Sequence, residues 1–138
     1  MKNIDHESLE LFVEESSLRL ARISADLELL AKSQPVNMEV IHSLFRETHS
    51  LKSAANLLAL RPVEQIAHKL EDILESMRNG LEVPDEQLMD ILYVGYARIG
   101  LLLNNPQVLQ LIDAGKDVAA IDDHLRARQK NKHMREAI

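Results

Sequence analysis

Residues 37–80 read NMEVIHSLFRETHSLKSAANLLALRPVEQIAHKLEDILESMRNG. In each half of this segment, apolar residues recur at steps of three and four, which is the spacing of one face of an α-helix. Asn37 suits the N-cap of the first half, Pro62 suits the first turn of the second, and Gly80 suits the C′ position after its end. The segment therefore predicts two consecutive amphipathic helices, the first of which runs from Met38 to Leu58.

One further helix is expected before this pair and one after it. Between Asp5 and Lys32, apolar residues again recur with helical spacing. Pro84 precedes two acidic residues, a combination that favours the positive end of a helix, and the apolar pattern then continues to Leu103. Four amphipathic helices joined by short connections are expected to pack as an antiparallel up-and-down bundle.

The C-terminal part of the sequence carries a shorter pattern. We expect a short helical piece at residues 107–112, a break at Gly115, and a last helix from Asp117 to Arg128. The basic residues that follow are expected to fray, so the bundle is assigned to residues 1–130 and a frayed tail to residues 131–138. No segment alternates apolar and polar residues as a half-buried strand does. The expected fold class is all-α: an antiparallel four-helix bundle with an additional C-terminal helix.

The composition limits the functional classes. The chain has 138 residues, a length that fits one domain with its own core. It has no cysteine, which excludes disulfides, thiolate metal sites and a cysteine nucleophile, and which fits a reducing compartment such as the cytoplasm. A net charge of −6 argues against nucleic acid as a partner, and no apolar run approaches the roughly 20 residues of a membrane span. We therefore expect a cytoplasmic chain that binds other proteins. As an isolated domain, we expect it to be a monomer.

The helical spacing places an imidazole, an ammonium and a carboxylate near one another. His49 lies about 135° from the centre of the apolar stripe of its helix and is expected to be accessible to solvent. Lys52 follows one turn later, at the i+3 spacing at which helical side chains meet. On the next helix, Glu71 lies about 110° from the apolar centre, at a border from which it can reach a neighbouring helix. His68 precedes this glutamate by three residues.

These residue types suit the transport of a phosphoryl group on a histidine nitrogen. A carboxylate that accepts a hydrogen bond from one imidazole N–H fixes which nitrogen keeps its lone pair, and Glu71 is the candidate for this role toward His49. A phosphoryl group brings about two negative charges, which the ammonium of Lys52 can stabilise through charge-assisted hydrogen bonds. Because phosphoryl transfer depends on alignment and electrostatic support, partner proteins can supply the metal ion and the remaining groups.

Two segments carry a resemblance to a known family. They are FRETHSLKSAA at residues 45–55 and AHKLEDIL at residues 67–74. The pair resembles histidine phosphotransfer (HPt) domains, most closely the N-terminal P1 type of the chemotaxis histidine kinase CheA. In that family, the histidine of an H-x-x-K motif is phosphorylated, which matches His49 and Lys52. A later H-x-x-E motif matches the histidine and glutamate of the second segment, with His68 in a supporting role.

The resemblance implies a part in two-component or chemotaxis signalling. Such a domain takes a phosphoryl group from the ATP-binding domain of a histidine kinase, which uses Mg-ATP, and passes it to an aspartate of a response-regulator receiver domain. The chain has no Gly-rich phosphate loop of its own, so no cofactor is expected in it. By this resemblance, the chain is the phosphoacceptor domain of a CheA-like histidine kinase.

The surface around His49 is the expected docking site for the receiver domain. Phe45 offers an apolar anchor, and Ser53 and Asn56 lie on the same side of the helix. The sequence departs from the family at Ser53, Ala54 and Asn56, where small, Gly-rich sequence usually follows the lysine. These larger residues are expected to affect the fit of the partner.

Two other interpretations stay open. His49, His68 and Glu71 are ligand types that a metal-binding bundle could use. Glu39 and His42 have the spacing found in di-iron bundles, but such bundles direct their ligands inward, whereas His42 lies outside the apolar stripe. No metal is therefore expected. The other interpretation is a helical adaptor or dimerisation module without chemistry, which the composition does not exclude.

Overall fold

The computed structural model describes residues 5–33, 35–106, 109 and 114–137. Within these residues, the chain forms helices and no strand, which confirms the all-α fold class. The helices are α1 (His6–Lys32), α2 (Met38–Leu57), α3 (Arg61–Arg78), α4 (Glu86–Leu103) and α5 (Gly115–Ala137). None of these described helices has both the length and the apolar composition of a membrane span.

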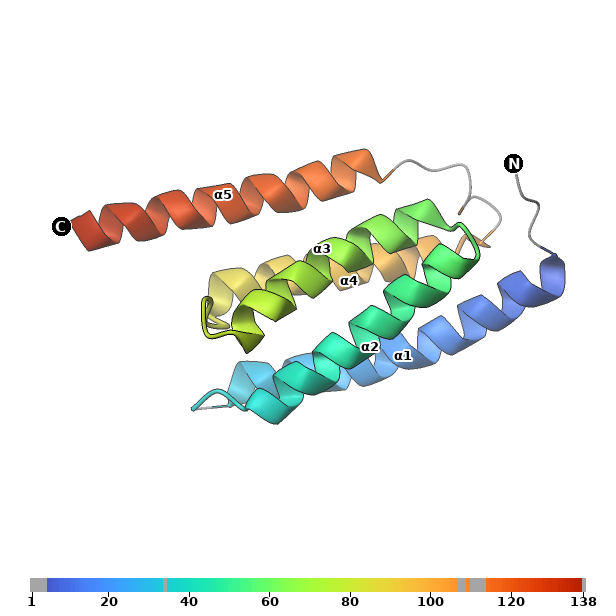
Figure 1. Ribbon diagram of the computed structural model, residues 1–138, viewed down its shortest axis with the longest axis horizontal. Coiled ribbons are helices and arrows are strands. Elements are labelled where there is room, and N and C mark those ends of the chain that lie inside the picture. The colour runs from blue at the N-terminus through green and yellow to red at the C-terminus, as the bar shows by residue number, and fades with distance from the viewer. Residues whose placement is uncertain (1–4, 34, 107–108, 110–113, 138) are drawn as a thin grey trace.

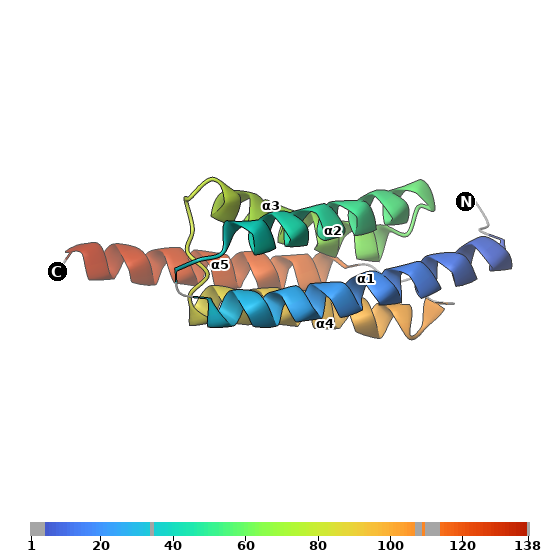
Figure 2. The same ribbon diagram turned by 90° about the horizontal axis from the view of Figure 1, so that it is seen from below.

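Helices α1 to α4 form an antiparallel up-and-down bundle, and α5 lies against one side of it (Figure 1). In the bundle, α1 packs against α2 and α4, and α3 also packs against α2 and α4. Helix α5 packs along α3 and α4 (Figure 2). Helix α2 therefore lies between α1 and α3, and its outer side faces solvent.

The starts of α2 and α4 are explained by side chains that cap them. Asn37 caps α2 as predicted, because its side-chain oxygen accepts hydrogen bonds from the backbone N–H groups of Glu39 and Val40. At the start of α4, the carboxylate of Asp85 accepts a bond from the Leu88 N–H at 2.9 Å. An acidic cap also lies favourably at the positive end of the helix dipole.

Helices α2 and α3 end in the same way. In both, the residue after the C-cap has a left-handed backbone: Ala59 has φ 57° and Gly80 has φ 75°. The next N–H then donates to the carbonyl five residues back, to Ala55 in α2 and to Ser76 in α3, each at 2.9 Å. This is the Schellman motif, so the predicted C′ role of Gly80 is confirmed. Ala59 takes the same role at an energetic cost, because its Cβ crowds the left-handed conformation.

The core is built from the apolar stripes predicted by the helical spacing. Leu44, Leu51 and Ala55, the centre of the stripe on α2, are each 0% exposed. A polar pair lies among the apolar residues, because the hydroxyl of Thr48 on α2 is 2.5 Å from the hydroxyl of Tyr96 on α4. Burial raises the pKa of Tyr96 more than the bond to Thr48 lowers it, so the phenol stays protonated.

Helix α5 differs most from the expectation drawn from the sequence. It begins at Gly115, for which the sequence predicts a break, and it continues to Ala137, past the predicted end at Arg128. The tail at residues 131–138, for which the sequence predicts fraying, is helical as far as the structure describes it. It is rich in residues of high helix propensity, and its basic residues suit the negative end of the helix dipole. The domain boundary at residue 130 stays a prediction.

The short helical piece predicted at residues 107–112 lies, apart from Leu109, outside the described residues. Leu109 itself is in a turn and is 0% exposed.

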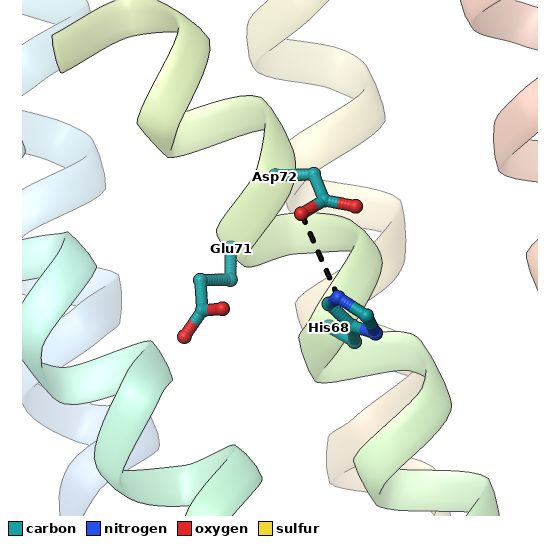
Figure 3. A group of neighbouring side chains, drawn as sticks. All are labelled: His68, Glu71 and Asp72. Atoms are coloured by element: carbon teal, nitrogen blue, oxygen red, sulfur yellow. Dashed lines mark ion pairs between the residues drawn. The ribbon is translucent and has the colours of Figure 1, made fainter.

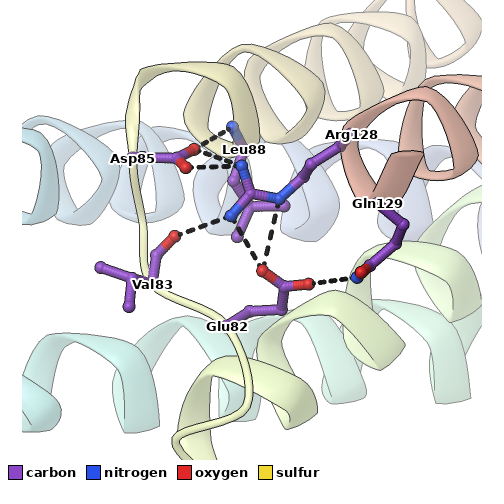
Figure 4. Close-up of polar contacts among 6 residues, drawn as sticks. All are labelled: Glu82, Val83, Asp85, Leu88, Arg128 and Gln129. Carbon is purple, nitrogen blue, oxygen red and sulfur yellow. Dashed lines mark hydrogen bonds and ion pairs between the residues drawn. The ribbon is translucent and has the colours of Figure 1, made fainter. Parts of the chain in front are cut away.

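Arg128 fastens α5 to the connection between α3 and α4 (Figure 4). Its guanidinium donates to Glu82 at 2.8 Å and to both carboxylate oxygens of Asp85 at 2.6 Å. It also donates to the backbone carbonyl of Val83 at 3.3 Å. The Arg128 side chain is only 8% exposed, although it belongs to a strongly polar helix. Charged contacts therefore take part in the attachment of α5, beside the buried Ile121.

Candidate functional site

His49 lies on the outer side of α2, and its side chain is 55% exposed, as expected from the helical spacing. Its Nδ1 atom lies 2.6 Å from Oε2 of Glu71 on α3. The side chain of Glu71 is only 11% exposed. The structure thus joins an exposed imidazole to a carboxylate that projects from the border of the neighbouring helix.

Lys52 reaches the same carboxylate from α2. Its Nζ donates to Oε1 of Glu71 at 2.7 Å, and its side chain is 24% exposed. Each oxygen of Glu71 therefore receives one contact from α2. The helical spacing alone places Lys52 beside His49, whereas the structure shows that the carboxylate of Glu71 connects them.

The charge state of Glu71 follows from these contacts. Burial by itself raises the pKa of this carboxyl group, but the hydrogen bonds and charges of Lys52 and His49 outweigh burial and leave the pKa of Glu71 below its ordinary value. The carboxylate is therefore ionised at neutral pH and can only accept hydrogen bonds. A neutral His49 then donates through its Nδ1–H and keeps the lone pair on Nε2, a tautomer assigned from the hydrogen-bond network.

Phe45 lies one turn before His49 on α2 and is half-buried. Its ring stacks on the imidazole, with 6.2 Å between the ring centroids and 9° between the planes. The guanidinium carbon of Arg78, at the end of α3, lies 4.1 Å from the centre of the phenyl ring, which is a cation–π contact. Arg78 was not among the residues singled out from the sequence. Its position seven residues after Glu71, on the same face of α3, is the signal that could have found it.

His68 lies on another part of this surface. Its side chain is exposed, and its Nε2 is 3.7 Å from Oδ1 of Asp72, one turn later on α3 (Figure 3). A shallow groove of about 290 Å³ is lined by Lys52, Ser53, Asn56, Glu64 and His68. The structure thus brings His68, Ser53 and Asn56 together beside Lys52, while the partner of the His68 imidazole is Asp72.

A group of possible metal ligands occurs on α3. One ligand atom each from His68, Glu71 and Asp72 lies within 4.8 Å of the others. However, both oxygens of Glu71 already contact α2, and Figure 3 shows its side chain directed toward that helix. Glu39 and His42 are both exposed and do not point into the bundle. The geometry therefore gives no support to the interpretation as a metal-binding bundle.

The fold and the site together define a class of protein. It is a helical bundle that presents an imidazole to solvent and holds one of its nitrogens with a carboxylate from the next helix. The Hpt domain family matches residues 7–137, which is nearly the whole sequence. The chain therefore belongs to the Hpt domain family, as the resemblance of its two motifs implies.

Curated relatives of the chain are chemotaxis proteins. It is 33% identical over 121 residues to the chemotaxis protein CheA of Halobacterium salinarum. It is 27% identical over 124 residues to the CheA proteins of Listeria monocytogenes and Bacillus subtilis. These matches cover 86% to 88% of this chain but only 17% to 20% of the relatives. The chain thus spans at most about a fifth of the length of these relatives.

The fold also matches a solved structure. This is the crystal structure of the phosphorylated P1 domain of CheA3 in complex with CheY6 from R. sphaeroides. The TM-score is 0.74 at 24% identity, and the match covers 88% of this chain and 94% of that chain. The chain therefore has the helical-bundle fold of a P1 domain.

Proposed function

We propose that this chain accepts a phosphoryl group on Nε2 of His49 from the ATP-binding domain of a histidine kinase. It then passes the group to an aspartate of a response-regulator receiver domain. The observation that carries this proposal is the imidazole itself, which is half-exposed and has its Nδ1 held 2.6 Å from the carboxylate of Glu71. The chemotaxis proteins among the relatives support a place in chemotaxis or two-component signalling, as the phosphoacceptor domain of a CheA-like kinase.

In the first transfer, the lone pair of Nε2 attacks the γ-phosphorus of ATP held by the kinase domain. A nitrogen–phosphorus bond forms, the bond to the bridging oxygen breaks, and ADP leaves with the electron pair. The Nδ1–H stays in place, so the phosphorylated ring carries a positive charge. The ionised carboxylate of Glu71 lies where it stabilises that charge. The kinase domain supplies Mg-ATP, and this chain needs no cofactor of its own.

In the second transfer, a carboxylate oxygen of the receiver aspartate attacks the same phosphorus. The nitrogen–phosphorus bond breaks and its electron pair returns to Nε2. The ring becomes neutral again with its proton still on Nδ1. The histidine is therefore ready for another cycle without any movement of the Nδ1 proton.

Lys52 is proposed to stabilise the phosphoryl group. Its contact with Glu71 uses one of the three N–H donors of an ammonium. The side chain is partly exposed, so the other donors can turn toward a phosphoryl group on Nε2. A positive charge beside the group stabilises its negative charges through charge-assisted hydrogen bonds and orients it for transfer.

The receiver domain is proposed to dock on the outer side of α2. The P1 domain of CheA3, whose fold this chain shares, was solved in complex with CheY6, which supports a receiver-domain partner. Phe45, Ser53 and Asn56 flank His49 on this side, and His68 borders the groove next to them. We further propose that the chain acts in the cytoplasm and is a monomer as an isolated domain.

The test is phosphorylation by a CheA-type kinase core that lacks its own phosphoacceptor domain. With Mg-ATP, wild type is expected to gain one phosphoryl group, detected by intact-protein mass spectrometry at neutral pH. The variant His49→Gln is expected to gain none. His42→Gln is the matched control, because His42 is an exposed histidine seven residues earlier on the same helix. It should be phosphorylated like wild type.

Equal phosphorylation of wild type and His49→Gln would contradict the proposal. Absence of phosphorylation in both proteins, with several kinase cores that phosphorylate their own P1 domains, would instead favour a helical adaptor. The receiver step is tested by mixing the phosphorylated domain with purified receiver domains. Loss of phosphate from the domain should then match its gain on the receiver aspartate.

A further inference from the structure

The contact with Glu71 restrains the Nδ1 edge of the His49 imidazole but does not involve the face of the ring. The ring moves by rotation about the Cα–Cβ and Cβ–Cγ bonds, and one hydrogen bond at its edge still allows small rotations about them. Such a rotation moves Nε2, the atom that must meet phosphorus in line with the leaving group. A contact on the face of the ring would narrow these rotations and define the direction of the Nε2 lone pair more closely.

Phe45 occupies the position from which such a constraint can act. It precedes His49 by four residues on α2, the spacing at which side chains on a helix meet. The two rings are nearly parallel, with 9° between their planes and 6.2 Å between their centroids. This is an offset stack, the favoured arrangement of flat rings. A turn of the imidazole out of its plane would break this contact.

Arg78 in turn holds the phenyl ring of Phe45. Its guanidinium carbon lies 4.1 Å from the ring centre, and the Arg78 side chain is only 33% exposed. The guanidinium is itself steadied by Glu75, one turn earlier on α3, at 3.3 Å. Glu71 and Arg78 lie two turns apart on one face of α3. From this face, Glu71 contacts Nδ1 of the imidazole and Arg78 contacts the face of the phenyl ring.

We propose that Phe45 and Arg78 are positioning residues for the phosphoryl transfer, which set the plane of the His49 ring and hence the direction of Nε2. This inference rests on the proposed function and adds residues to it. Phe45 acts on His49 directly, and Arg78 acts through Phe45. Neither residue contacts the phosphorus in this proposal.

A positioning role differs measurably from the docking role expected for Phe45 from the sequence. A docking anchor contributes to binding of the partner, so its removal raises KM and leaves kcat unchanged. A positioning residue contributes to alignment in the transition state, so its removal lowers kcat and leaves KM unchanged. The two roles can therefore be separated by measuring KM and kcat with both partners: the kinase core, with the whole domain as its substrate, and a purified receiver domain, with the phosphorylated domain as the donor.

The experiment compares four variants at the stack and a control. Phe45→Leu removes the ring but keeps an apolar side chain, and it is expected to lower kcat about tenfold with KM within about twofold of wild type. Arg78→Gln is expected to lower kcat about threefold. Phe45→Tyr and Arg78→Lys keep the ring and the charge and should restore most of the rate. The control is Arg61→Gln, an exposed arginine at the start of α3, which should behave as wild type.

Nuclear magnetic resonance of the His49 ring gives a readout that loss of folding does not mimic. In Phe45→Leu, the Nδ1-protonated tautomer should persist because Glu71 is unchanged. The order parameter of the ring Cε1–Hε1 bond should fall, since the stacking partner is gone. Circular dichroism and thermal unfolding establish that each variant is folded, and Arg78→Gln, at a partly exposed position, keeps the test available if Phe45→Leu unfolds.

Two results would overturn the inference. One is an unchanged kcat with a raised KM in Phe45→Leu, which would assign Phe45 to docking alone. The other is unchanged kinetics in both Phe45→Leu and Arg78→Gln. Either result leaves the proposed function intact as long as His49→Gln is not phosphorylated, so the failure of one is distinguishable from the failure of the other.

Discussion

Glu71 is the residue on which the site converges. An ionised carboxylate loses hydration when it is buried, and a buried ion pair repays that cost only when its hydrogen bonds are well made. Here both oxygens have close contacts, with Nδ1 of His49 at 2.6 Å and Nζ of Lys52 at 2.7 Å. Because such a pair contributes little net stability, its presence is better explained by the orientation that it gives the imidazole.

The lowered pKa of Glu71 predicts a pH dependence of folding stability. Burial opposes the shift, but the donors Lys52 and His49 outweigh it, so the folded pKa lies below the ordinary value of 4.5. A carboxyl group with a lowered pKa adds stability above its unfolded pKa, and this contribution is lost as the pH falls through the folded pKa. Wild type should therefore lose this contribution on acidification below about pH 4.5, whereas Glu71→Gln has no such contribution to lose.

The measurement is urea unfolding of both proteins at a series of pH values from neutral to acid. The difference in the free energy of unfolding between wild type and Glu71→Gln is expected to shrink in the acid range. A difference that stays constant over the whole series would show that the ionisation of Glu71 does not contribute to stability.

At the scale of the helices, α3 and α4 approach each other closely at Gly95. A Cβ atom placed on Gly95 would lie 2.5 Å from Cδ2 of Leu70, a contact too short for carbon atoms. Leu70 is 0% exposed, so its side chain has little room to move away. The glycine therefore allows the close packing of α4 on the helix that carries Glu71.

This packing predicts opposite effects for two glycines of α4. Gly95→Ala gains about 1 kcal/mol of helix propensity but overpacks the core at a cost of about 1–3 kcal/mol, so it is expected to destabilise the domain. Gly100→Ala gains the same propensity, and its Cβ would lie 3.9 Å from Leu20, an ordinary contact. It should stabilise the domain by up to about 1 kcal/mol. Thermal unfolding measures both changes, and stabilisation by both substitutions would contradict the overpacking.

The sequence predicts an element best when the signal is local. Asn37 and Gly80 mark helix ends through their own chemistry, and both predictions are confirmed. The turn at Ala59 has no such signal, because alanine seldom adopts a left-handed backbone. The prediction that the last helix ends at Arg128 was wrong, because α5 continues to Ala137. Helix propensity and the helix dipole favour this extension, and a search for recurring apolar residues does not detect either effect.

For the site, the helical spacing predicts which side chains leave the core but not which atoms meet. The exposure of His49 and the reach of Glu71 toward α2 both follow from angles around the helix axis. The stack of Phe45 on His49 under Arg78 depends on side-chain rotamers and on the distance between α2 and α3. Those quantities come from packing across the whole bundle, which one helical segment does not encode.

At the scale of the whole molecule, α5 is attached to the bundle by charged contacts as well as by the buried side chain of Ile121. Arg128 makes the most buried of them, to Glu82 and Asp85. Burial alone raises the pKa of Asp85, but the bonds from Arg128 and from the Leu88 N–H outweigh it, so the pKa of Asp85 is lowered and the pair stays charged. Lys69 of α3 also pairs with Asp122 of α5 at 2.9 Å.

Removal of the Arg128 charge is expected to loosen α5 without unfolding the bundle. Arg128→Met keeps the length of the side chain but leaves two carboxylates without their partner. The cost to the attachment of α5 is about 2 kcal/mol, below the 3–5 kcal/mol of a fully buried pair because Asp85 is half exposed. Hydrogen exchange should show faster exchange in α5 while α1 to α4 keep their protection.

Arg126→Met is the matched control for this prediction. Arg126 lies on the same helix and pairs with Asp123 at the surface, where the two side chains are 74% and 69% exposed. Exposed pairs contribute about 0–1 kcal/mol, so exchange in α5 should stay close to wild type. Equal exchange in Arg128→Met and Arg126→Met would show that Arg128 does not hold α5.

The bond between Thr48 and Tyr96 has a consequence for the histidine that follows it in the chain. A helix turns by about 100° per residue, so slippage of α2 by one position in one of the two directions would carry the imidazole toward the interior. The interior hydroxyl pair, which joins α2 to α4, resists such slippage. Burial raises the pKa of Tyr96, so the phenol keeps its proton. The hydrogen bond between Thr48 and Tyr96 therefore does not depend on the charge of the imidazole. The outward direction of the His49 side chain thus depends on Thr48, the preceding residue, which is fully buried.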